Sequence, residues 1–170
     1  MLSDPLIFTF SAALLGLCIG SFLNVVIHRL PKMMERQWRT ECAELAGQQA
    51  PPAERYNLVV PRSACPSCNR QIPALENIPL VSYLVLRGRC AGCAAPIGLR
   101  YPAVEALTAP LAASVAWHFG FGIAAAGALL FTWAMIALTF IDLDTYYLPD
   151  GITLPLLWLV SPNFYYLLLV

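Results

Sequence analysis

The chain alternates between long apolar runs and one long polar stretch. Residues 5–27 contain no charged side chain, and a helix needs roughly 20 apolar residues to cross a bilayer. Further apolar runs occupy residues 103–119, 123–141 and 151–170. The pattern predicts an all-α polytopic membrane protein with about four transmembrane helices and an insertion between the first and the second.

Glycine and charge set the limits of these segments. Gly120-Phe121-Gly122 separates two of the runs and suits a tight helical hairpin. No basic residue precedes the run at 5–27, which argues against a cleaved signal peptide. We therefore expect a first transmembrane helix over residues 1–27 and a polar domain over 28–102. Residues 103–170 are expected to form the first three helices of a membrane domain.

Composition and charge support this division. The chain is 59% hydrophobic and 12% charged, against about 45–50% and about 25% in soluble domains. All ten basic residues lie between Arg29 and Arg100 together with five acidic residues, so this stretch carries +5 and the remainder −5. Basic segments next to membrane spans mark the cytoplasmic side. The scattered charges do not form the basic patch typical of nucleic-acid binding, so we expect no nucleic-acid partner.

Two Cys-x-x-Cys pairs lie within this basic stretch: Cys65 with Cys68, and Cys90 with Cys93. Two such pairs at this separation are typical of a tetrahedral zinc site, and four thiolates leave no open position for catalysis. A disulfide or thiol-redox role is the alternative, although disulfides are rare on the cytoplasmic side. The other two cysteines, Cys18 and Cys42, match no ligand spacing.

Three carboxylates follow the third apolar run: Asp142, Asp144 and Asp150. They either end the span in water or take part in chemistry, since two carboxylates that share a proton can activate water for peptide hydrolysis. Asp142 and Asp144 point about 200° apart on a helix, so a catalytic partner would come from another helix. Asp150 precedes Gly151 and is placed to cap the following helix.

The chain resembles the bifunctional type IV prepilin peptidases, which are membrane aspartic proteases that also methylate pilin N-termini. The likeness rests on four stretches in the family's order. They are Gly20–Pro31 (GSFLNVVIHRLP), the four-cysteine segment with Glu76–Tyr83 (ENIPLVSY), Arg100–Glu105 (RYPAVE) and Ile141–Asp150 (IDLDTYYLPD). The resemblance covers about residues 12–158.

The resemblance implies a catalytic role for Asp142, with Asp144 and Asp150 in supporting roles, and a cytoplasmic zinc domain built on the four cysteines. It further implies S-adenosylmethionine as methyl donor, and prepilin or pseudopilin leaders as substrates for type IV pili or type II secretion. The implied location is the bacterial inner membrane, in contact with lipid, with the Arg29–Arg100 segment cytoplasmic. It assigns no residue to methyl transfer.

One element of the family pattern is missing. The family's second catalytic aspartate lies in a Gly-x-Gly-Asp motif, and no such motif occurs in these 170 residues. We therefore expect the N-terminal half of such an enzyme, inactive as a peptidase on its own, for which a second chain could supply the missing half. The alternative is a non-enzymatic zinc-binding membrane protein that interacts with pilin or secretion components. Asn24 and Glu105 are expected to make polar contacts between helices.

Overall fold

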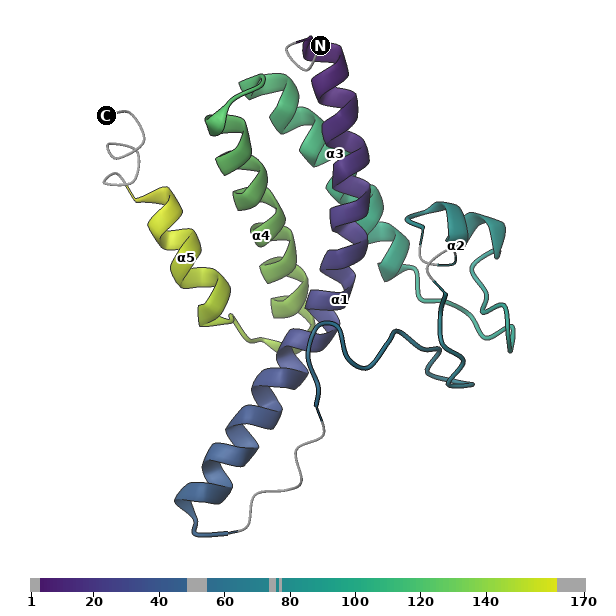
Figure 1. Ribbon diagram of the computed structural model, residues 1–170, viewed down its shortest axis with the longest axis vertical. Coiled ribbons are helices and arrows are strands. Elements are labelled where there is room, and N and C mark those ends of the chain that lie inside the picture. The colour runs from purple at the N-terminus through teal and green to yellow at the C-terminus, as the bar shows by residue number, and fades with distance from the viewer. Residues whose placement is uncertain (1–3, 49–54, 74–75, 77, 162–170) are drawn as a thin grey trace.

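The computed structural model describes residues 4–161 except 49–54, 74–75 and 77. Its helices, in chain order, are α1 (Pro5–Leu45), α2 (Val81–Val85), α3 (Arg100–Phe119), α4 (Ile123–Thr145) and α5 (Asp150–Val160). The described residues contain no strand, only two isolated bridges. The helical prediction is therefore confirmed for this part of the chain. In Figure 1, α1 runs along the whole bundle and extends well beyond its lower end.

Helix α1 is longer than the apolar run from which it was predicted. It begins after Asp4, whose carboxylate accepts a hydrogen bond from the Leu6 N–H at 2.9 Å, with Pro5 in the first turn. It continues through the buried Pro31 to Leu45 without interruption. The last third of α1 therefore carries charged residues away from the bundle as a projecting helical arm, residues 32–45.

Glycines allow α1 and α3 to pack closely. A Cβ added at Gly20 would lie 2.9 Å from the Glu105 Cα, and one at Gly16 would lie 2.9 Å from the Ala112 Cβ. These two glycines are one helical turn apart, an arrangement that lets helix backbones approach in membranes. Close packing along this seam fixes the start of α3 against the middle of α1.

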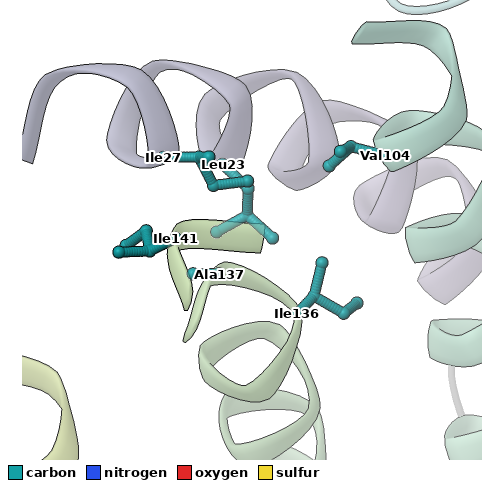
Figure 2. Close-up of a cluster of buried hydrophobic side chains, with 6 residues drawn as sticks. All are labelled: Leu23, Ile27, Val104, Ile136, Ala137 and Ile141. Carbon is teal, nitrogen blue, oxygen red and sulfur yellow. The ribbon is translucent and has the colours of Figure 1, made fainter. Parts of the chain in front are cut away.

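A cluster of apolar side chains joins α4 to this pair. Figure 2 shows the cluster between the three helices, and its members are Leu23, Ile27, Val104, Ile136, Ala137 and Ile141. Ile141 is fully buried and directly precedes Asp142. The core therefore extends to the last turn of α4, where the acidic residues begin.

The hairpin between α3 and α4 has the predicted form, with α3 ending at Phe119 and α4 starting at Ile123. Of the four predicted spans, α1 and α4 are long and apolar enough to cross a membrane. Helix α3 has 20 residues and does not meet that test, and α5 has 11 described residues. The rest of the fourth run, 162–170, lies outside the described residues.

Candidate functional site

The four cysteines lie on two turns that share one backbone pattern. In the first turn, the Asn69 N–H donates to the Cys65 carbonyl at 2.9 Å, and the Cys65 N–H donates to the Arg70 carbonyl at 3.0 Å. In the second, Ala94 and Ala95 stand in the same relation to Cys90, at 2.9 and 2.8 Å. The residue four positions after each leading cysteine has a left-handed backbone, with φ of 56° in both turns. The chain thus builds the same knuckle twice.

The two knuckles bring all four sulfur atoms together. The Sγ atoms of Cys65, Cys68, Cys90 and Cys93 all lie within 4.8 Å of one another, and those of Cys65 and Cys93 are 3.8 Å apart. The described cysteines form no disulfide. Gly92 keeps the second knuckle close to the first, because a Cβ there would lie 3.0 Å from the Arg70 Cδ. The cluster is able to hold a metal ion.

The thiols do not share one pKa. The backbone N–H groups of Ser67 and Cys68 lower the pKa of Cys65 to about 6. At Cys93 the Ala95 N–H favours the thiolate, but the Cys68 thiol, burial and the other thiols outweigh it and raise the pKa to about 11. Like charges at this spacing cannot all ionise without a cation. The cluster therefore favours a thiolate-binding metal.

Residues 142–150, called here the acidic segment, include the end of α4 and the connection to α5. The Tyr146 N–H donates to the Asp142 carbonyl at 2.9 Å, and Tyr146 adopts the left-handed conformation that ends the helix. The Asp142 side chain is exposed and has no hydrogen bond or ion pair among the described residues. The carboxylate of Asp144, by contrast, forms an ion pair with Arg100 at the start of α3.

Asp150 does not cap α5 as predicted. Pro149 occupies the N-cap position, and Asp150 is the first residue of the helix with no side-chain capping bond. Pro149 is fully buried and adopts an extended backbone, which ends the connection and leaves Asp150 in the first turn. There the positive end of the helix dipole stabilises its negative carboxylate.

The two polar residues predicted between helices make specific contacts. Glu105 is 8% exposed, and its Oε2 accepts a hydrogen bond from the Leu80 N–H at 2.8 Å. Asn24 is 6% exposed and donates from Nδ2 to the Tyr101 carbonyl at 3.0 Å. Glu105 thereby ties the segment that carries the cysteines to α3.

Sequence patterns did not indicate three further contacts of α1, one of which reaches the acidic segment. Trp38 of the helical arm meets Tyr147 edge-on, with ring centroids 5.3 Å apart. The buried Arg29 donates to the Asn57 carbonyl at 3.0 Å, and Arg36 lies over the Tyr56 ring at 4.0 Å. Each contact joins residues that are distant in the chain, so no local spacing could signal it.

Comparisons with known proteins found one matching family and several similar proteins. The sequence profile of the Bacterial Peptidase A24 N-terminal domain matches residues 14–119. A protein of Pseudomonas aeruginosa named prepilin leader peptidase/N-methyltransferase is 56% identical over 158 residues, covering 92% of this chain and 54% of its own length. No solved structure matches the chain.

Relatives from other bacteria carry the same name. The protein of Aeromonas hydrophila is 59% identical over 150 residues, covering 85% of this chain and 51% of its own length. That of Neisseria gonorrhoeae is 51% identical over 150 residues, with 87% and 52% covered. The chain thus spans about half the length of the curated relatives that it matches.

Proposed function

This chain belongs to the Bacterial Peptidase A24 N-terminal domain family, and we propose that it forms part of a prepilin leader peptidase and N-methyltransferase. The observation that carries the proposal is the 56% identity to a protein of that name over 92% of this chain. The proposed substrates are prepilins or pseudopilins of type IV pili or type II secretion, and the proposed activities are leader cleavage and methylation of the new N-terminus.

The proposed topology follows from the charges. Residues 1–27 would form the first transmembrane helix, 28–102 a cytoplasmic domain, and 103–170 the start of a membrane peptidase domain. Two observations support several spans in a bacterial inner membrane: α1 and α4 are long and apolar enough to cross a bilayer, and all ten basic residues fall between Arg29 and Arg100. The acidic segment would then lie at the cytoplasmic surface, where a basic leader is presented.

We propose Asp142 as one carboxylate of an aspartic dyad. In such a dyad one ionised carboxylate takes a proton from water while a protonated partner donates to the scissile carbonyl. The exposed carboxylate of Asp142, with no ion pair among the described residues, is available for this role. The partner would come from a Gly-x-Gly-Asp motif supplied by sequence beyond this one or by a second chain. Asp150 would support the same segment.

We propose zinc as the metal of the four-cysteine cluster, in a structural role. A tetrahedral ion with bonds of about 2.3 Å to sulfur places the sulfurs about 3.8 Å apart. The Cys65–Cys93 separation of 3.8 Å and the spread of all four sulfurs within 4.8 Å fit that size. S-adenosylmethionine is proposed as methyl donor from the activity in the relatives' names, and none of the described residues is assigned to it.

A chimera tests the peptidase proposal. Residues 1–160 would be joined to the remaining part of the Pseudomonas aeruginosa relative, and leader removal from a prepilin would be followed in membranes. We expect cleavage by the chimera, loss of cleavage in its Asp142→Asn variant, and none by the 170-residue chain alone.

The control variant is Glu44→Gln, which removes an exposed carboxylate of α1 and should leave cleavage unchanged. The helical circular dichroism and melting temperature of each variant in detergent distinguish lost catalysis from lost folding of the bundle. Continued cleavage by Asp142→Asn at the rate of the parent would refute the catalytic assignment.

A further inference from the structure

Asp144 and Arg100 form the contact that joins the end of α4 to the start of α3. A carboxylate oxygen of Asp144 pairs with a guanidinium nitrogen of Arg100. The two residues are 44 positions apart in the sequence. Both side chains are about one-third exposed, 34% for Asp144 and 37% for Arg100, so solvent screens the pair only in part. Asp144 is one residue from the end of α4, in the same last turn as Asp142.

Each of these charges is unfavourable within its own helix. Arg100 is the first residue of α3, where the helix dipole repels a cation. Asp144 lies in the last turn of α4, where the dipole repels an anion. For the helices taken alone, an anion at the start of α3 and a cation at the end of α4 would be more stable. The pair compensates both charges across the helix boundary, and a local rule broken in this way often marks a functional position.

The rest of the acidic segment is anchored on other sides. Ile141, before Asp142, is fully buried in the core cluster. Tyr147 meets Trp38 of the helical arm, and Pro149 is fully buried. The ion pair adds the anchor within the last turn of α4 itself. Within the last turn of α4, the carboxylate of Asp142 is left without a hydrogen bond or ion pair to any described residue, whereas that of Asp144 is paired.

Arg100 is itself firmly placed. It follows the second cysteine knuckle, in which the Ile97 N–H donates to the Gly88 carbonyl at 2.8 Å. One turn further along α3, the buried Glu105 binds the Leu80 N–H. The guanidinium therefore projects from a helix start that is fixed by the segment bearing the cysteines.

We propose that Asp144 is a positioning residue, whose ion pair with Arg100 sets the orientation of the last turn of α4 and thereby aims the carboxylate of Asp142. This inference rests on the proposed function in its reference to catalysis. The mechanical part, a clamp between α3 and α4, stands on the contacts alone. Asp144 takes no proton and touches no substrate in this scheme. It orients Asp142 through the helix backbone that the two residues share.

The test uses charge neutralisation and charge exchange in the chimera. Asp144→Asn should lower kcat about ten- to hundredfold with KM nearly unchanged, because a misaimed carboxylate slows the chemical step more than binding. Exchanging the charges with Arg100→Asp and Asp144→Arg together should restore kcat to within a few-fold of the parent. The matched control is Glu35→Arg, which breaks the exposed Arg39–Glu35 pair on α1 and should change neither constant.

Hydrogen exchange on the 170-residue chain provides a second readout that needs no activity. Arg100→Asp alone should speed amide exchange in residues 141–147, and the charge exchange should restore protection. Failure of the exchanged pair to restore kcat would overturn the proposal and indicate that Asp144 reacts directly. Unchanged amide exchange in Arg100→Asp would overturn the clamp. If Asp142→Asn still cleaves, the catalytic assignment of Asp142 fails, while hydrogen exchange continues to decide the clamp.

Discussion

In the bundle, α1, α3 and α4 bury six apolar side chains in one cluster and bring glycines into backbone contact. Among the described residues of 55–99, by contrast, Cys65 is the one that is buried. Close packing of side chains stabilises the bundle. The cysteine segment, residues 55–99, has two backbone turns and almost no buried core. We therefore expect this segment to depend on a bound metal for stable folding. Apart from the contact through Glu105, the two regions should therefore respond independently to metal loss and to packing defects.

The largest effect should come from removing a metal ligand. Cys65→Ser is expected to abolish stoichiometric metal binding, because three thiolates and a hydroxyl do not replace a four-thiolate site. Residues 55–99 should become sensitive to protease, while the helical circular dichroism of the bundle is retained. Metal analysis and limited proteolysis measure both effects.

The control for this variant is Cys42→Ser, which removes an exposed cysteine of the helical arm outside the cluster. It should retain the metal. An unchanged metal content in Cys65→Ser would contradict the four-ligand assignment, and loss of bundle helicity would contradict the independence of the two regions.

Metal affinity should fall as pH falls. With a pKa of about 11, the Cys93 thiol is protonated at neutral pH and must release its proton on binding. Each proton released weakens binding tenfold per pH unit, so affinity should drop at least about a hundredfold from about pH 8 to about pH 6. Near pH 6 the Cys65 thiolate also begins to be protonated, which steepens the dependence. Competition with a chelator of known pH dependence measures it, and a flat profile would exclude thiolate ligation.

The seam between α1 and α3 should be sensitive to a single methyl group. Gly20→Ala places a Cβ 2.9 Å from the Glu105 Cα, and such overpacking costs about 1–3 kcal/mol. The melting temperature of the bundle in detergent should therefore fall, while metal affinity is unchanged. The matched control is Gly127→Ala on α4, where the new Cβ meets no atom within 4 Å and removal of glycine flexibility stabilises by about 0.5–1 kcal/mol. Equal melting temperatures for the two variants would contradict the close contact.

The helical elements were largely predictable from the sequence. The apolar runs at 103–119 and 123–141 match α3 and α4 closely because Gly120 and Gly122 mark the turn between them. The continuation of the first helix into the helical arm was not predicted, because the boundary was placed at residue 27, where the apolar run ends, although the following stretch is rich in good helix formers such as Met, Glu and Arg. Asp150 was assigned to the cap because the extended conformation of Pro149 could not be read from local sequence.

The two candidate sites also differed in how far the sequence alone predicted them. Each Cys-x-x-Cys pair encodes its own turn, so spacing alone predicted the sulfur cluster. The spacing of the acids showed only that Asp142 and Asp144 point apart. The partner of Asp144 lies 44 residues earlier at Arg100, and a contact of that kind depends on how α3 and α4 pack. Tertiary contacts of this range leave no periodic signal in a single sequence.

Glu105 is the residue through which the two regions should communicate, although with the smallest effect. Its buried Oε2 accepts from the Leu80 N–H at 2.8 Å. Glu105→Ala leaves that N–H without a partner, at a cost of about 1–3 kcal/mol. We expect a lower melting temperature of the bundle together with weaker metal binding, because α3 and the cysteine segment lose a shared contact. Glu105→Gln keeps an acceptor oxygen and should recover most of both losses. If Glu105→Ala changes only the melting temperature, the cysteine segment folds without help from α3, and the separation between the two regions is complete.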